Sequence, residues 1–324
     1  MPAGSAPPAV HARGVTKTYG DVQAVRGIDL TVAQGETFGF LGPNGAGKTT
    51  TIAMLCTLAA PSAGRIEIAG HDTRGAPHEV RRAIGLVFQE STLDGELTAA
   101  ENLRFHADLY ALPTATLPAR VDAMLGLVGL TERRDSLVRT FSGGMRRRLE
   151  IARGLLHQPR LLFLDEPTLG LDPQTRAHVW TYLSEIRARE ETTIFLTTHY
   201  LEEAESCDRI AIIDGGRIVA EGTPAELKSV VGADRIELRT EDDTAAARAL
   251  RERFGLEATA FQGGLRVRAE DGARAVPALC SGLGVLVHEV TVIRPTLDDV
   301  FFHHTGRGLR DDASPPGADP AGEH

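Results

Sequence analysis

The stretch GPNGAGKTTT, residues 42–51, places glycines, a lysine and threonines directly after the apolar run ETFGFL. It fits the spacing GxxxxGK[ST] of a phosphate-binding loop between a strand and a helix. Glycine lets backbone N–H groups turn toward phosphate oxygens, and the N-terminus of the helix adds positive charge. We expect Lys48 to reach the β- and γ-phosphates and Thr49 to ligate Mg²⁺, whereas an ordinary glycine-rich turn would leave the lysine solvated. The nucleotide-binding residues expected in this loop are Gly42, Pro43, Asn44, Gly45, Ala46, Gly47, Lys48, Thr49 and Thr50.

A second chemical feature is the pair Asp165 and Glu166, which ends the apolar run LLFLDE. A carboxylate at the end of a buried strand is the expected form of an Mg²⁺-holding aspartate in nucleotide sites, so we assign that role to Asp165. Glu166 is then placed to accept the proton of an attacking water or to orient that water. The alternative is a strand that merely ends in an acidic turn.

A third feature is Ser142-Gly143-Gly144, which stands directly before a strongly amphipathic helical pattern. A hydroxyl and unobstructed N–H groups at the positive end of a helix form a second phosphate-binding surface. One chain does not need two such surfaces for one phosphate. Taken without the other motifs, the same residues are an ordinary helix N-cap followed by a flexible turn.

The phosphate loop alone fits a GTPase, a nucleotide kinase, a recombinase-type ATPase or a transporter ATPase. With FSGGM placed between that loop and LLFLDE, the chain resembles the ATP-binding subunit of an ABC transporter over about residues 10–230. The resemblance implies an α/β P-loop cassette with a mixed sheet core, an antiparallel β patch and a helical signature subdomain. Phe141 and Met145 depart from the usual Leu and Gln of the signature; we expect Phe141 to pack and Met145 to lose one polar contact.

The resemblance assigns roles to four further residues. Tyr19 is expected to stack on adenine, and Gln89 to contact Mg²⁺ or water and to face the membrane subunits. Asp172 corresponds to the dimer-contact loop, and His199 to the switch histidine that contacts the γ-phosphate. Taken singly, each has a structural alternative: a core or surface tyrosine, a loop glutamine, a helix cap and a structural histidine.

The resemblance also implies how ATP is used. Two copies pair head to tail, so that Ser142 to Gly144 of one copy close over ATP on the phosphate loop of the other. Hydrolysis to ADP and phosphate resets this closed homodimer. The implied partner is a separate integral membrane permease, which would hold the chain as a peripheral subunit at the cytoplasmic face of the membrane.

The signature region together with the C-terminal stretch RPTLDDVFFHHTGR resembles the daunorubicin-resistance type of drug-export ATPase. Export of a drug or antibiotic-like substrate is therefore the favoured function. A soluble ABC ATPase acting in translation or DNA repair is the main alternative, although such proteins usually carry two cassettes or long coiled coils. A P-loop kinase is a second alternative, which the signature and His199 disfavour. Thr296 is expected to cap a terminal helix whose Val300 and Phe301 pack inward.

The elements that must position these residues follow from short apolar runs. Five of them predict strands buried on both faces of a largely parallel sheet: TFGFLG, IGLVFQ, RLLFLDEP, TTIFLTTH and RIAIIDGG. Alternating residues before position 36 and around 64–70 predict the antiparallel patch. Helical patterns separate the strands, one of them opened by the capping box Thr98-x-x-Glu101. After residue 233 a smaller α+β unit of possible ferredoxin-like topology is expected.

Composition limits the remaining possibilities. A hydrophobic content of 42% supports two packed domains, and the net charge of −9 argues against a nucleic-acid partner, although Arg146 to Arg148 form a local basic run. We read those arginines as a solvated face or as partners of carboxylates. No stretch reaches the length of a membrane span. The expected organisation is a disordered start (1–9), an ATPase domain (10–230), an accessory α+β domain (233–305) and a disordered tail (306–324).

Overall fold

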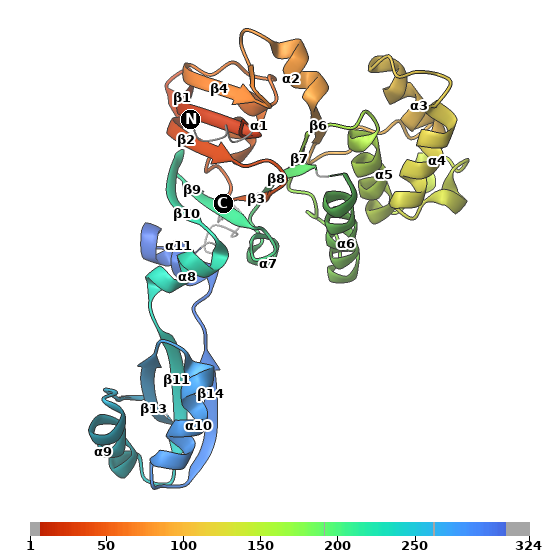
Figure 1. The fold of residues 1–324 in the computed structure, drawn as a ribbon. Helices are drawn as coiled ribbons and strands as arrows, with labels where there is room; N and C mark the ends of the chain where they lie inside the picture. The colour runs from red at the N-terminus through yellow and green to blue at the C-terminus, as the bar shows by residue number, and fades with distance from the viewer. Residues whose placement is uncertain (1–6, 191, 262, 309–324) are drawn as a thin grey trace, which may run out of the picture. The chain divides into compact units, whose positions relative to one another are not determined.

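The computed structural model describes residues 7–190, 192–261 and 263–308, which divide into two compact units between Glu221 and Gly222 (Figure 1). This division lies before the boundary expected near residue 230. Helix α8 (Pro224–Val231) belongs to the second unit because it packs against α11 (Leu297–Thr305). Of the two ends expected to be disordered, residues 1–6 and 309–324 lie outside the described residues.

A six-stranded sheet forms the centre of the first unit. Its strands lie in the order β10 (Arg217–Gly222), β9 (Arg209–Asp214), β3 (Thr37–Leu41), β8 (Thr193–Thr198), β7 (Leu161–Asp165) and β6 (Ile84–Val87). The pairs β3–β8, β3–β9, β7–β8 and β6–β7 are parallel, and every residue of β3, β7 and β8 is buried. The five apolar runs therefore form strands, as predicted.

An antiparallel sheet packs against this centre. It consists of β2 (Val22–Val32), β1 (Val10–Tyr19), β4 (Ala63–Ile68) and β5 (His71–Asp72), and it shares one hydrophobic core with α1 (Lys48–Leu55), α2 (Pro77–Ala83) and the six-stranded sheet. Ala9 is 3% exposed and donates its N–H to the Val32 carbonyl at 2.9 Å. Ala9 thus hydrogen-bonds to the sheet, whereas the disordered start was expected to reach residue 9.

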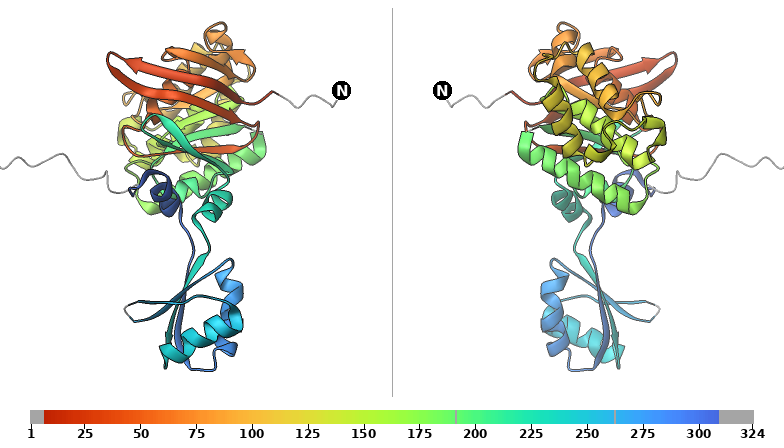
Figure 2. Two further views of the ribbon diagram at one scale, coloured as in Figure 1. Left: turned by 90° about the vertical axis from the view of Figure 1, so that its left-hand side faces the viewer. Right: turned by 90° about the vertical axis from the view of Figure 1, so that its right-hand side faces the viewer.

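A group of helices lies at the other end of the six-stranded sheet, away from β1 and β4 (Figure 1). It contains α3 (Ala99–Leu109), α4 (Leu117–Leu127), α5 (Gly143–Leu155) and the short helix η2 (Val138–Thr140), which share a separate core. The short helix η1 (Thr131–Arg133) follows α4 and has no buried residue. The predicted capping box of α3 is present, and Phe141 is 4% exposed within this core. The long helix α6 (Pro173–Glu190) and the short α7 (Leu201–Ala204) complete the unit (Figure 2).

The second unit contains a split β-α-β arrangement. Strands β11 (Asp234–Thr240), β12 (Thr259–Phe261), β13 (Gly264–Ala269) and β14 (Val287–Ile293) form an antiparallel sheet in the order β12-β13-β11-β14, with α9 (Asp243–Phe254) and α10 (Gly272–Gly282) between them in sequence. This confirms the ferredoxin-like topology. The prediction missed β12, which spans only three residues. Thr296 caps α11, and Val300 and Phe301 are fully buried, as expected.

Candidate functional site

The phosphate loop connects the end of β3 to the start of α1. Lys48 is 5% exposed, and its Nζ donates to the carbonyls of Gly42 at 2.7 Å and Pro43 at 3.0 Å. Gly47 has a φ of 106°, and a Cβ atom there would lie 2.7 Å from the Ala24 carbonyl oxygen. A glycine is therefore needed at this position, both for the backbone conformation and for the close approach of β2.

A cavity of about 190 Å³ lies on this loop. Gln89, Glu166 and Ala24 line it together with seven residues of the loop and the start of α1: Pro43, Asn44, Gly45, Gly47, Lys48, Thr49 and Thr50, of which the last three belong to α1. The structure thus brings together residues from the P-loop, from the segment after β6 and from the segment after β7. Ala24 was not predicted, because an alanine in an alternating strand carries no chemical signal.

The two predicted carboxylates follow β7 and occupy different surroundings. Asp165 is 4% exposed, and the Thr197 hydroxyl of the neighbouring strand β8 donates to its Oδ1. Glu166 lies with Oε1 at 3.4 Å from Lys48 Nζ and Oε2 at 3.3 Å from His199 Nδ1. The site therefore places one cation and one histidine on opposite oxygens of a single carboxylate.

These contacts decide the charge of Glu166. Burial alone would raise the pKa of its carboxyl, but the contact with His199 and the positive charge of Lys48 outweigh burial and hold that pKa below its usual value. Burial also lowers the pKa of Lys48, and the charge of Glu166 opposes that shift. Glu166 is consequently ionised at neutral pH and able to accept a hydrogen bond or a proton.

The backbone of Glu166 is strained, with a φ of 47°. A non-glycine residue in this left-handed region costs about 1–3 kcal/mol and persists where its surroundings fix it. Its N–H donates to the Thr197 carbonyl at 3.2 Å and to the Thr197 hydroxyl at 3.0 Å. Thr197 thus holds both carboxylate residues, a role that the threonines of TTIFLTTH did not reveal in the sequence.

The predicted Ser-Gly-Gly surface forms the N-terminus of α5. The Ser142 hydroxyl accepts a hydrogen bond from the Met145 N–H at 3.3 Å, so it caps the helix. A Cβ atom on Gly144 would lie 2.3 Å from Thr175 Cγ2, whereas one on Gly143 would meet Leu171 at an ordinary 3.7 Å. Gly144 therefore permits the close packing of α5 on α6. None of Ser142, Gly143 and Gly144 lines the cavity on the phosphate loop.

The four residues assigned by resemblance lie in different places. Tyr19 ends β1, is 50% exposed and has Lys17 Nζ at 4.7 Å from its ring centroid, but it does not line the cavity. Gln89 is exposed and does line it. Asp172 accepts hydrogen bonds from the Thr175 N–H at 3.0 Å and hydroxyl at 2.6 Å, so it caps α6. His199 follows β8 and contacts Glu166.

The donor set suits a magnesium ion shared with phosphates. Thr49 and Gln89 line the cavity with neutral oxygens, and Asp165 directly precedes Glu166, which also lines it; oxygen ligands of this kind fit a hard cation that keeps water and phosphate ligands. Across the described ranges no group of three or more His, Cys, Asp or Glu side chains forms an all-protein metal cage. The residues present therefore fit Mg²⁺ that arrives with a nucleotide.

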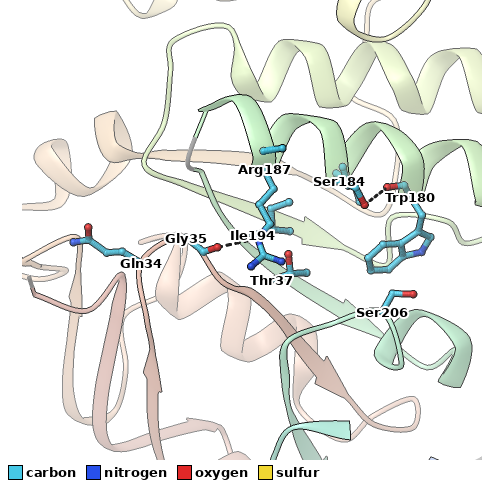
Figure 3. Close-up of a pocket in the computed structure, with 10 residues that line it drawn as sticks. Gln34, Gly35, Thr37, Trp180, Ser184, Arg187, Ile194 and Ser206 are labelled. Carbon is cyan, nitrogen blue, oxygen red and sulfur yellow. Dashed lines mark hydrogen bonds between the residues drawn. The ribbon is translucent and has the colours of Figure 1, made fainter. Parts of the chain in front are cut away.

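A larger cavity, of about 540 Å³, lies between α6, β8 and the turn before β3 (Figure 3). Trp180 and Arg187 project into this region from α6, and Arg187 donates to the Gly35 carbonyl at 2.9 Å and pairs with Asp208 at 2.8 Å. No predicted site residue lines it. Its size therefore does not identify it as the nucleotide site.

Each of the two units matches a known protein family. The chain matches the family model for ABC transporters over residues 25–169, and the model for the C-terminal domain of DrrA1-3-like ATP-binding proteins over residues 222–305. It is 44% identical to a daunorubicin resistance ATP-binding protein of Streptomyces coeruleorubidus, covering 93% of this chain and 97% of that protein. A linearmycin resistance ATP-binding protein of Bacillus subtilis is 38% identical, with 93% and 100% covered.

The solved structures that resemble this chain are also ATP-binding cassettes. A structure described as the ATP-binding subunit of an ABC transporter aligns with a TM-score of 0.62 and 32% identity, covering 68% of this chain and 92% of that one. A dimeric ATP-binding cassette in a post-hydrolysis state with ADP and phosphate aligns with a TM-score of 0.60 and 28% identity, covering 66% and 98%. Within the residues that the structure describes, no helix is long and apolar enough to cross a membrane.

Proposed function

The chain belongs to the family of ABC transporter ATP-binding subunits, and on that premise we propose that it powers export of a drug or antibiotic-like molecule through a separate membrane permease. It is an ATP-hydrolysing enzyme. The observation that carries the proposal is the ionised Glu166, which lines the cavity on the phosphate loop and contacts both Lys48 and His199. The alternative role in translation or DNA repair has no support among the relatives, several of which are resistance or export subunits.

In the proposed reaction, the loop amides and Lys48 bind the phosphates of ATP. Glu166 accepts a hydrogen bond from the attacking water and draws its proton as the water oxygen bonds to the γ-phosphorus. The bond to the β–γ bridging oxygen breaks, and ADP leaves with that oxygen. His199 contacts a γ-phosphate oxygen. Thr49, Gln89 and Asp165 would hold Mg²⁺, which when bound neutralises phosphate charge.

Two copies complete the proposed site. Ser142 and the N–H groups of Gly143 and Gly144 from one copy close over the γ-phosphate held by the other, because the N-terminus of α5 attracts anions. Asp172 contacts the partner copy, and Tyr19 stacks on adenine. A related cassette with a dimeric solved structure supports this arrangement.

The membrane partner is proposed to dock near residues 89–103. This segment runs from Gln89 into the first half of α3. Docking there would connect a permease to the nucleotide site through Gln89, and it would hold the chain at the cytoplasmic face of the membrane. Relatives named for daunorubicin and linearmycin resistance suggest the class of cargo.

Two measurements test the proposal. Purified protein supplied with ATP and Mg²⁺ should yield ADP and free phosphate; a phosphorylated small molecule would instead indicate a kinase. Tagged protein isolated from its native host in mild detergent should bring an integral membrane protein with it. Recovery of the tagged chain with soluble partners alone would contradict the transport function.

A further inference from the structure

Arg147 is buried next to the backbone that flanks Glu166, although it belongs to the basic run Arg146 to Arg148. It lies on α5, which packs beside β6 (Figure 1), and it is 6% exposed. The expectation of a solvated face was therefore wrong for this residue, and the expectation of a carboxylate partner was correct, because its Nη1 pairs with Glu150 Oε2 at 3.2 Å.

The guanidinium of Arg147 donates to three backbone carbonyls. Its Nε reaches the Pro167 carbonyl at 2.6 Å, its Nη2 the Asp165 carbonyl at 3.0 Å, and its Nη1 the Phe88 carbonyl. Asp165 and Pro167 stand on either side of Glu166. One planar side chain thus holds the backbone before and after the strained residue.

Glu150 completes the arrangement. It is 2% exposed, and while Oε2 pairs with Arg147, its Oε1 accepts the N–H of Thr92 at 2.8 Å. Phe88 and Thr92 bracket the segment that contains Gln89. The Arg147–Glu150 pair therefore fixes that segment at two points as well as the backbone around Glu166.

We propose that Arg147 is a positioning residue that keeps Glu166 in its left-handed conformation and ties it to the Gln89 segment. The inference rests on the proposed function, in which Glu166 orients the attacking water. Arg147 acts through the backbone rather than by touching ATP. Without it, the strain at Glu166 is released by rotation of φ, and the carboxylate moves away from Lys48 and His199.

The first test is Arg147→Lys, with Arg148→Lys as the matched control on the same helix. Lysine keeps the charge beside Glu150, but its three donors sit on one nitrogen and cannot span the three separate carbonyls that the planar guanidinium reaches. We expect kcat for ATP hydrolysis to fall about 100-fold, since small displacements of a catalytic group have effects of that size. KM and ATP affinity should change less than about threefold, because the phosphate-loop contacts stay. Arg148 donates to the Val128 carbonyl and Tyr182 instead, so its variant should keep wild-type kcat.

A second variant separates positioning from stability. Arg147→Met combined with Glu150→Gln removes both buried charges and keeps an acceptor for the Thr92 N–H, and replacing both members of a buried pair is often neutral for folding. We expect this variant to fold and to bind ATP, with a lower melting temperature because three carbonyl groups lose their donor, yet to hydrolyse ATP as slowly as Arg147→Lys. Wild-type kcat in either folded variant would overturn the proposal.

The dependence on Glu166 is tested in the Glu166→Gln background. There Arg147→Lys should reduce hydrolysis no further, because residues that act through one another are not additive. A full additional loss would show that Arg147 acts elsewhere and would overturn the proposal. If Glu166→Gln alone hydrolyses ATP normally, the proposed role of Glu166 fails first. If it is defective while Arg147→Lys is normal, only the inference fails.

Discussion

Lys48 and His199 approach opposite oxygens of the Glu166 carboxylate, at 3.4 and 3.3 Å. With its pKa held below the usual value, this carboxylate stays ionised at the pH of the cell. The group proposed to receive the proton of water is thus in its acceptor form before the reaction begins. The ammonium group of Lys48 also donates hydrogen bonds to two carbonyls of the phosphate loop. These bonds hold its charge at the proposed phosphate site.

Lys48→Ala tests this arrangement at the residue scale. We expect turnover to fall at least about 100-fold, because a preorganised charge facing the transferred phosphate is removed. ATP binding should weaken as well, since the lysine also faces phosphates in the ground state. Steady-state phosphate release and titration with a fluorescent ATP analogue measure the two effects. Lys228→Ala, in α8 of the second unit, serves as the control, and equal turnover by both variants would refute the assignment of the loop.

Single residues were predictable where the motif is local. The sequence singles out Lys48, Asp165 and Glu166 because strand, loop and helix patterns surround them, and in the structure Lys48 and Glu166 line one cavity while Asp165 lies next to Glu166 in the chain. Their roles stay predictions. Arg147 was missed because its backbone partners Phe88 and Pro167 lie 59 and 20 positions away. A contact to distant carbonyl groups leaves no trace in side-chain spacing.

At the scale of elements, the close packing of α5 on α6 depends on one missing side chain. We expect Gly144→Ala to lower the free energy of unfolding by about 1–3 kcal/mol, because its Cβ atom would overlap Thr175 and force the helices apart. Gly143→Ala, where the nearest side chain is at an ordinary distance, should change the free energy of unfolding by less than about 1 kcal/mol, because it meets no clash and alanine favours a helix more than glycine does. Urea unfolding of both variants provides the comparison. A Gly143 variant less stable than the Gly144 variant would contradict this packing account.

The helical group should also respond to pH. Burial lowers the pKa of His106 on α3 to about 4, assisted by the charges of Arg153 and His157. An unfolded histidine titrates near 6.5, so the unfolded chain binds a proton between these values that the folded chain does not. The free energy of unfolding should therefore fall as pH drops, by about 2 kcal/mol at pH 5 from this residue.

His106→Leu provides the measurement for that prediction. Urea midpoints at pH 7.5 and pH 5 should differ less in the variant than in the wild type. Burial also lowers the pKa of His157, so part of the dependence remains in the variant. An unchanged difference between the two pH values would show that His106 does not contribute.

Elements were predictable wherever a periodic pattern was long enough. The five apolar runs, the capping box at Thr98 and the helix cap at Thr296 all appear in the structure. The strand β12 was missed because three residues carry no readable alternation. The structure divides between Glu221 and Gly222 because α8 packs against α11, and no local sequence pattern predicts a contact between helices so far apart in the chain.

At the scale of the whole molecule, the proposed site needs two copies of the chain. Within one chain, the cavity on the phosphate loop is lined by the loop, Gln89 and Glu166 but not by Ser142 to Gly144. The proposal therefore gives the second phosphate-binding surface to the partner copy. Sequence motifs could suggest this pairing through resemblance alone, because the contacts that would prove it lie between chains.

Glu166→Gln tests the central claim, that hydrolysis at a site shared between two copies drives opening of a dimer. Glutamine keeps the size of Glu166 but cannot accept the proton of water, so ATP remains bound and favours the closed pair by mass action. Two double variants distinguish loss of dimer closure from loss of ATP binding. Adding Ser142→Arg should block closure while each chain still binds ATP, and adding Lys48→Ala should prevent ATP binding itself.

The deciding measurement is size-exclusion chromatography with light scattering on Glu166→Gln in ATP and Mg²⁺, alongside phosphate release. We predict a dimer in ATP, a monomer in ADP, phosphate release at least about 100-fold below wild type, and no dimer in either double variant. A Glu166→Gln protein that hydrolyses ATP at the wild-type rate, or that binds ATP and stays monomeric, would contradict the account.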